Sequence, residues 1–138
     1  MLFRSGFERG VTVQSSSQGL DPAITLDAIR KSEGRLRGVL RADRDLTDAD
    51  LKKLHAGGIR GIRIELRESG GGGTVKVDPR EQDGHFTGDR FDKVVAQAAR
   101  NNWSVCLHIG PKSLIEHADI IRRMPAQTVI EKIGRAHV

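Results

Sequence analysis

The sequence predicts an α/β fold in which about five parallel strands are connected by roughly four helices. Short runs rich in β-branched residues alternate with helix-like runs along the whole chain. Repeated strand–helix units of this kind are typical of a parallel sheet with crossover helices. The length of 138 residues and the 37% hydrophobic content suit one domain with a buried core. No second domain is predicted.

In the first half of the chain, predicted strands alternate with predicted helices. The strands cover residues 10–14, 36–40 and 62–66, and the helices cover Ala23–Lys31 and Asp48–Ala56. Pro22 suits the first turn of the earlier helix, because proline needs no hydrogen-bond partner there. Residues 47–50 resemble a capping box with Asp50 in place of the usual Glu, and Gly57 and Gly58 end the later helix.

The second half repeats the pattern after a glycine-rich polar loop at residues 70–85. A helix is predicted for residues 89–101, where Phe91, Val94, Val95 and Ala98 recur at helical spacing. A strand follows at residues 104–109. The next helix covers residues 113–123 and stops near Pro125, and a last strand begins at residues 128–130.

Alternation within the strands indicates which kind of parallel sheet this is. Apolar residues alternate with polar ones, as Ile62, Ile64 and Leu66 do with Arg63, Glu65 and Arg67, and as Val105, Leu107 and Ile109 do with Ser104, Cys106 and His108. Parallel strands covered on both faces would be apolar throughout. One face therefore packs on helices, and the other becomes charged toward the carboxyl ends. A (β/α)8 barrel has such an inner face, so we expect part of a barrel, because a whole one needs about 250 residues. A mixed sheet with one solvated face is the alternative.

The amino-acid composition limits the classes of partner that the chain is expected to bind. The single cysteine excludes a disulfide framework, no apolar run approaches a membrane span, and no signal peptide is recognisable. The net charge of +5 comes from basic residues interleaved with acidic ones, and aromatic residues make up only 4%. The interleaved charges indicate a solvated surface first and a small anionic ligand second, and these features argue against nucleic acid and membrane partners. A cytoplasmic location is expected, and the oligomeric state is left open.

Several segments in a fixed order resemble one enzyme family. They are residues 10–16 (GVTVQSS), 37–39 (RGV), 54–63 (LHAGGIRGIR), 103–108 (WSVCLH) and 129–131 (VIE). The chain resembles the amidohydrolase-related metal-dependent hydrolases, and within them the 2-pyrone-4,6-dicarboxylate lactonase branch, over roughly residues 7–131. The resemblance implies a distorted (β/α)8 barrel. Members hydrolyse lactones, amides or related bonds, and some decarboxylate.

The resemblance also assigns site residues. Arg63 matches an arginine that contacts a substrate carboxylate, Ser16 matches a small ligand-facing hydroxyl residue, and His108 matches a catalytic position at a strand end. Each has an ordinary alternative. Arg63 could form a salt bridge with Glu65 or Asp43, Ser16 could serve only the turn, and His108 could be a satisfied inward histidine. Cys106 is expected to be a small buried residue, and His55 and His85 are expected at the surface.

Some family features are absent from this sequence. It contains no His-x-His pair, Lys132 stands where the family has a histidine, and the strand with the family's catalytic Asp is missing. A metal in such a site lowers the pKa of bound water to near 7. The cofactor is therefore unassigned, since a divalent metal such as zinc would need ligands from outside this sequence.

The end of the chain suggests a boundary after residue 131. Residues 133–138 (IGRAHV) can be back-translated as ATC-GGA-AGA-GCA-CAC-GTC, part of a common short-read sequencing adapter. We therefore predict that residues 1–131 are an internal fragment of a barrel domain and that residues 132–138 are a translated adapter tail. A partial barrel exposes strand edges and apolar faces, so the 138-residue chain alone is expected to be poorly soluble and inactive.

The predicted function is that of a hydrolase acting on a small carboxylated substrate such as a lactone, in the full-length parent. A decarboxylase of the same superfamily is one alternative. Another is a non-catalytic, flavodoxin-like or receiver-like module of five parallel strands, with its site at a topological switch point. A nucleic-acid module ranks last, because no motif or basic stripe supports it.

Overall fold

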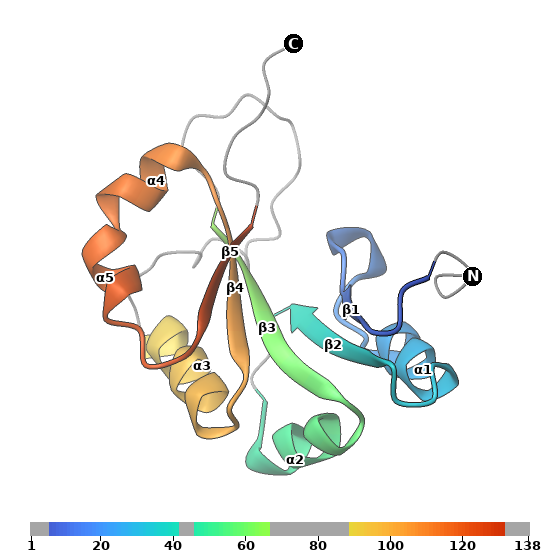
Figure 1. The fold of residues 1–138 in the computed structure, drawn as a ribbon. Coiled ribbons are helices and arrows are strands. Elements are labelled where there is room, and N and C mark those ends of the chain that lie inside the picture. Colours follow the sequence, from blue (N-terminus) through green and yellow to red (C-terminus); the bar gives the residue numbers. More distant parts are fainter. Residues whose placement is uncertain (1–5, 42–45, 67–88, 132–138) are drawn as a thin grey trace. The chain divides into compact units, whose positions relative to one another are not determined.

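The computed structural model describes residues 6–41, 46–66 and 89–131. Its five strands follow the order β1-β2-β3-β4-β5 (Figure 1). The elements in chain order are β1 (Gly10–Val13), η2 (Ser16–Gln18), α1 (Ala23–Lys31), β2 (Leu36–Arg41), α2 (Asp48–Ala56), β3 (Ile59–Leu66), α3 (Asp89–Arg100), β4 (Ser104–Ile109), α4 (Pro111–Glu116), α5 (Ala118–Arg122) and β5 (Thr128–Glu131). The chain divides into two compact units, residues 1–63 and 64–138.

The helices and strands agree with the sequence prediction in most places. Helices α1 and α2 and strand β4 begin and end at the predicted residues, whereas β3 begins three residues earlier, at Ile59. The single helix predicted for residues 113–123 is wrong, because the chain forms α4 and α5 there instead. Between them, His117 has φ −111° and ψ 15°, outside the helical region. The loop predicted at residues 70–85 lies outside the described residues. No helix in the described parts of the chain is long and apolar enough to cross a membrane.

Helix α2 starts at the predicted capping box. The Thr47 side chain accepts a hydrogen bond of 3.2 Å from the backbone N–H of Asp50, and an Asp50 carboxylate oxygen accepts one of 3.0 Å from the backbone N–H of Thr47. The box therefore satisfies two N–H groups at the start of the helix, where no intrahelical partner exists.

Strand β2 lies between β1 and β3 in the first unit. Both pairs are parallel, with Val13 opposite Val39 and Arg41 opposite Arg63. In the flavodoxin-like order the first strand lies between the second and the third. The first unit therefore has a different order, in which each strand follows its neighbour in sequence, as in a (β/α)8 barrel.

Gly38 permits the close contact between β2 and α1. A Cβ atom at this position would lie 2.5 Å from Ile59 Cδ1, 2.8 Å from Ile29 Cδ1 and 3.0 Å from Thr25 Cγ2. This contact identifies the face of β2 that α1 covers, and Figure 1 shows α1 beside β1 and β2. Leu40, two residues further along, shares that face and is buried.

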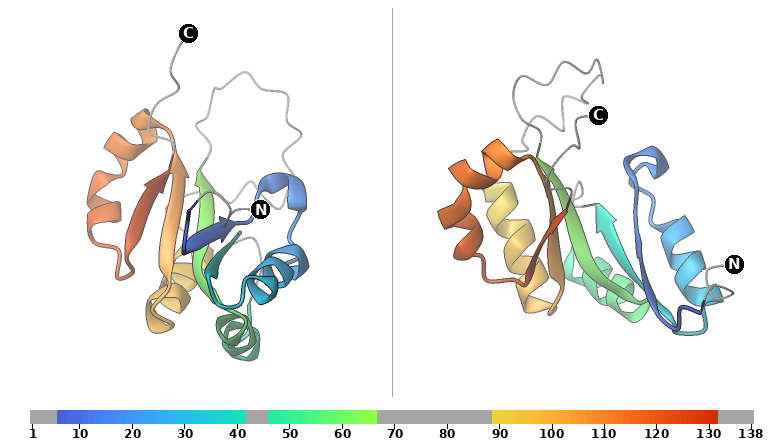
Figure 2. Two further views of the ribbon diagram at one scale, coloured as in Figure 1. Left: turned by 45° about the vertical axis from the view of Figure 1, so that its right-hand side comes forward. Right: turned by 45° about the horizontal axis from the view of Figure 1, so that its top comes forward.

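The second unit has its own apolar core. Strands β4 and β5 pair in parallel, and α3 packs against β4 (Figure 2). The helix buries Phe91, Val94, Val95 and Ala98, as the helical spacing predicted, against a core that includes Trp103, Val105, Leu107 and Ile109. Cys106 is also buried, as predicted.

Candidate functional site

Four polar residues of the first unit lie at or near the carboxyl ends of its strands. Gln14 and Ser16 follow the end of β1, Arg41 is the last residue of β2, and Arg63 lies in the second half of β3. Figure 2 shows the η2 turn directly beyond the end of β1. Carboxyl strand ends lie at the same edge of a parallel sheet, and that edge holds the active site in (β/α)8 enzymes.

Arg63 lies on the sheet face opposite the one that packs on α1. Its neighbour Ile62 is 3% exposed and is opposite Leu40, a residue of the helix-covered face. Because successive side chains point to opposite faces, Arg63 points to the other face. It is half-buried and makes polar interactions within the chain. The side chain of Glu65 and all of Asp43 lie outside what the structure describes, so the predicted alternative salt bridge is untested.

The two arginines of the run at residues 59–63 serve different ends of the strand. Arg60 donates hydrogen bonds of 2.6 Å to the carbonyl of His55 and 2.7 Å to that of Ile59. The carbonyl of His55 belongs to the last turn of α2, where the negative end of the helix dipole favours a cation. Arg60 therefore stabilises the helix end, whereas Arg63 lies nearer the carboxyl edge.

Gln14 holds the carboxyl edge of the first unit together. Its side chain is 1% exposed, and its Nε2 donates a hydrogen bond of 2.9 Å to the carbonyl of Asp21. Its Oε1 accepts one of 3.1 Å from the backbone N–H of Arg41, and its own backbone N–H donates one of 2.9 Å to the carbonyl of Val39. One buried amide therefore links the end of β1, the end of β2 and the loop before α1.

Ser16 opens the η2 turn at this edge. The residues around it make local bonds: the Oγ atoms of Ser15 and Ser17 lie 2.7 Å apart, and Gln18 Oε1 accepts a hydrogen bond of 3.0 Å from the backbone N–H of Ser15. Serine runs commonly form such turns. Turn chemistry is thus present around Ser16, and its role toward a ligand remains a prediction.

His108 lies at the corresponding edge of the second unit. It is half-buried in β4 and lies opposite Glu131 of β5 in the parallel register. Register partners on adjacent strands direct their side chains to the same face. The pairing therefore places a carboxylate on the neighbouring strand beside the imidazole, and both residues make polar interactions in the structure.

Two further histidines, His55 and His85, are predicted to lie at the surface. His55 lies in the last turn of α2 and is half-buried rather than fully exposed. His85 lies outside the described residues. No three His, Cys, Asp or Glu side chains in the described ranges gather closely enough to hold a metal ion. The described residues therefore do not form a metal centre by themselves.

Comparison with known proteins decides the family. The model of the amidohydrolase family named Amidohydro_2 matches residues 1–137. The chain belongs to the amidohydrolase family. It is 27% identical over 135 residues to the 4-sulfomuconolactone hydrolase of Rhizobium radiobacter, covering 98% of this chain and 42% of the relative. It is 29% identical over 133 residues to the 2-pyrone-4,6-dicarboxylate hydrolase of Comamonas testosteroni, covering 96% of this chain and 40% of the relative.

Solved structures agree with this amidohydrolase assignment. A probable 2-pyrone-4,6-dicarboxylic acid hydrolase from Acinetobacter baumannii, crystallised with citric acid, matches with a TM-score of 0.73 and 25% identity, over 94% of this chain and 44% of that one. A Pseudomonas putida structure named for the same activity matches with a TM-score of 0.71 and 28% identity, over 92% of this chain and 42% of that one. The chain spans less than half the length of these relatives. Its fold is therefore part of an amidohydrolase (β/α)8 barrel, as predicted.

The sequence predicts Arg63, Ser16 and His108 as site residues, and it does not point to Gln14, Arg41 or Glu131, which the structure places at or next to strand ends. Gln14 ends a β-rich run, and Arg41 ends another. In the sequence, the pattern that could have pointed to these residues is a polar residue directly after an apolar strand. Which of these residues meet depends on the strand register, which only the folded structure supplies.

Proposed function

We propose that the protein to which this chain belongs hydrolyses a small carboxylated lactone. The position of Arg63 carries the proposal, because it lies toward the carboxyl end of β3 on the face away from α1. A guanidinium offers a planar fork that matches a carboxylate. The relatives support the proposal, since they are named as lactone hydrolases and one similar structure contains citric acid, a tricarboxylate.

In this proposal His108 acts as the general base. It takes a proton from water while the water oxygen bonds to the lactone carbonyl carbon, and the ring C–O bond then breaks. The proton returns to the departing ring oxygen, so the ring opens with the net addition of one water. Glu131 positions the imidazole, Arg63 binds a substrate carboxylate, and Ser16 contacts the ligand through its hydroxyl group.

Hydrolysis is tested with the full-length protein encoded by the source gene. We expect it to convert 2-pyrone-4,6-dicarboxylate into a product heavier by one water, detected by mass spectrometry. A product lighter by one carbon dioxide would instead identify a decarboxylase, and no turnover of any carboxylated lactone would contradict the proposal.

The predicted site residues are tested separately in the same protein. Arg63→Gln should raise KM about tenfold or more, because a charge-assisted hydrogen bond is lost. His108→Gln should lower kcat about a hundredfold, as expected for a lost general base. Arg60→Gln is the matched control, since Arg60 serves the end of α2; its KM should stay near the wild-type value. Equal changes in KM for the Arg60 and Arg63 variants would refute the role of Arg63.

A further inference from the structure

We propose that Arg41 is a second anion-binding residue, which determines substrate specificity together with Arg63. Its position in the register supports this role. Arg41 and Arg63 are direct partners in the parallel pairing of β2 and β3. Neighbouring strands lie about 4.8 Å apart, so two guanidinium groups start from adjacent backbone positions on one face. This inference rests on the proposed function, because the ligand would be the carboxylated substrate.

Burial and charge argue for a ligand at this pair. Both arginines are half-buried, and the two residues that precede them, Leu40 and Ile62, are buried on the opposite face. Like charges directly opposite each other in a sheet are unfavourable. A carboxylated ligand reduces this repulsion by supplying negative charge between the two forks, in addition to the polar interactions that both residues make within the chain.

The backbone around Arg41 is held in place by buried groups. Gln14, which is 1% exposed, accepts the hydrogen bond from the backbone N–H of Arg41 through a side chain that also binds the carbonyl of Asp21. The base of the Arg41 side chain is therefore fixed relative to β1 and to the loop before α1. Such support behind a binding residue lowers the cost of ordering it when a ligand arrives.

Arg37 provides a matched control on the same strand and the same face. It lies four residues before Arg41, so the alternation of side chains directs both to one side of β2. The Arg37 guanidinium, however, donates hydrogen bonds of 2.9 Å to the carbonyls of Gly34 and Leu36, at the amino end of the strand. Replacing Arg37 therefore removes the same charge from the same strand without touching the carboxyl edge.

The experiment measures ligand binding by the full-length protein with isothermal titration calorimetry. Isophthalate, a dicarboxylate that cannot be hydrolysed, is compared with benzoate, its monocarboxylate counterpart. Arg41→Gln should weaken isophthalate binding about tenfold or more and benzoate binding much less, because one carboxylate still reaches Arg63. Arg37→Gln should leave both affinities unchanged. An Arg41→Gln variant that binds isophthalate as tightly as Arg37→Gln does, or loses both ligands equally, would overturn the inference.

A second variant covers the case in which Arg41→Gln does not fold. Arg41→Lys keeps the charge but loses the bidentate fork, so isophthalate binding should weaken several-fold. An unchanged affinity in this variant, with Arg41→Gln unfolded, would assign Arg41 a structural role instead. The turnover assay separates the two proposals. Isophthalate binding that depends on Arg41, without lactone turnover, would refute the proposed function alone, whereas turnover with no dependence on Arg41 would refute only this inference.

Discussion

The buried side-chain oxygen of Gln14 accepts a hydrogen bond of 3.1 Å from the backbone N–H of Arg41, across 27 residues of sequence. The same amide donates to the carbonyl of Asp21 at 2.9 Å. At the end of a strand, some backbone N–H and C=O groups have no hydrogen-bond partner on the neighbouring strand. Where such groups are buried, another group must bond to them. Gln14 supplies two such bonds at the edge where the proposed site lies.

Replacement of Gln14 by leucine should therefore destabilise the fold. Leucine is similar in size to glutamine but has no polar atoms. The variant therefore leaves the Arg41 N–H and the Asp21 carbonyl without their partner, which costs about 1–3 kcal/mol. Urea unfolding followed by circular dichroism measures the change. Gln14→Glu retains an acceptor for the Arg41 N–H but loses the donor and buries a carboxylate facing the Asp21 carbonyl, so it should also be less stable than wild type at neutral pH. A Gln14→Leu protein as stable as wild type would contradict the bridging role.

Gly38→Ala should also destabilise the first unit, for a steric reason. The added methyl group would lie 2.5 Å from Ile59 Cδ1 and 2.8 Å from Ile29 Cδ1, so these packed side chains must shift. Overpacking of this kind costs about 1–3 kcal/mol. Thermal unfolding measures the loss. Ile59→Val removes one of the crowded methyl groups, so the loss should be smaller in the Ile59→Val background. Equal losses in both backgrounds would exclude this contact as the cause.

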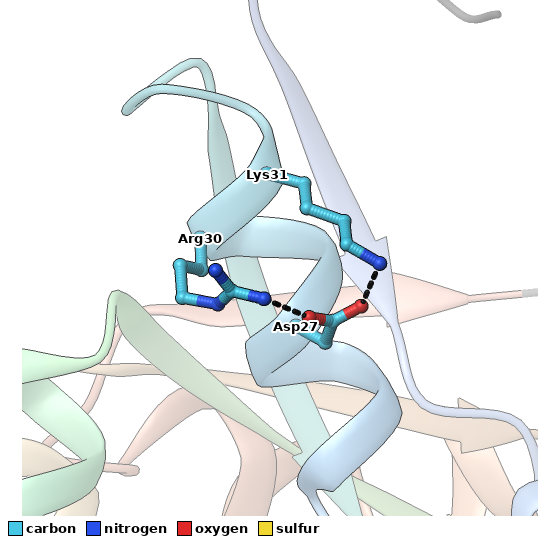
Figure 3. A network of polar contacts seen from close by, with 3 residues as sticks. All are labelled: Asp27, Arg30 and Lys31. Carbon is cyan, nitrogen blue, oxygen red and sulfur yellow. Dashed lines mark hydrogen bonds and ion pairs between the residues drawn. The ribbon is translucent and has the colours of Figure 1, made fainter.

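The ion pairs of Asp27 predict a small, pH-dependent contribution to stability (Figure 3). Lys31 Nζ lies 2.7 Å from one carboxylate oxygen of Asp27, and Arg30 Nη2 lies 2.6 Å from the other. Hydrogen bonds from Lys31 and then Arg30 hold the pKa of Asp27 below its ordinary value of 3.8. A lowered pKa in the folded state adds stability above the unfolded value, and this stability is lost as pH falls through the folded value.

Asp27→Asn should therefore be slightly less stable than wild type at neutral pH. The difference should be small, because the three side chains are exposed and salt screens them. Melting temperatures measured across a pH series test this. The melting temperatures of the two proteins should converge as the pH falls below 3.8, and also at high salt. A difference that persists under strong acid would show that the pairs are not its source.

Glu131 of β5 is expected to act on catalysis through His108, its register partner on β4. Glu131→Gln should lower kcat several-fold in the full-length protein while KM changes little, because the imidazole loses its orienting charge but the anion site is intact. Glu131→Asp retains the carboxylate and should recover part of the rate. A KM effect without a kcat effect, or no recovery by Asp, would argue against a positioning role. Steady-state kinetics on 2-pyrone-4,6-dicarboxylate supply both constants.

The origin of residues 132–138, which follow Glu131, can be tested by DNA sequencing alone. Residues 132–138 lie outside the described part of the chain, and we propose that they are a translated adapter. Sequencing the source DNA across this point should show codons that diverge from the adapter after Glu131. Genomic DNA that encodes the same seven residues followed by a stop codon would refute the proposal.

Local signals in the sequence predicted most of the individual elements. The capping box at Thr47 and the helical spacing from Phe91 to Ala98 depend on neighbours within a turn or two, so α2 and α3 could be placed from sequence. The break at His117 could not be predicted. The apolar pattern continues through it, whereas in the structure its backbone lies outside the helical region.

The sequence by itself determined the α/β class, the alternation of helix-packed and polar strand faces, and the resemblance to amidohydrolases. Only the tertiary structure decided which strand ends meet, because the register of a strand depends on partners far away in sequence. A register shift between Gly38 and Val39 sets Arg41 opposite Arg63. No local pattern encodes that offset, so the second arginine became visible only in the folded chain.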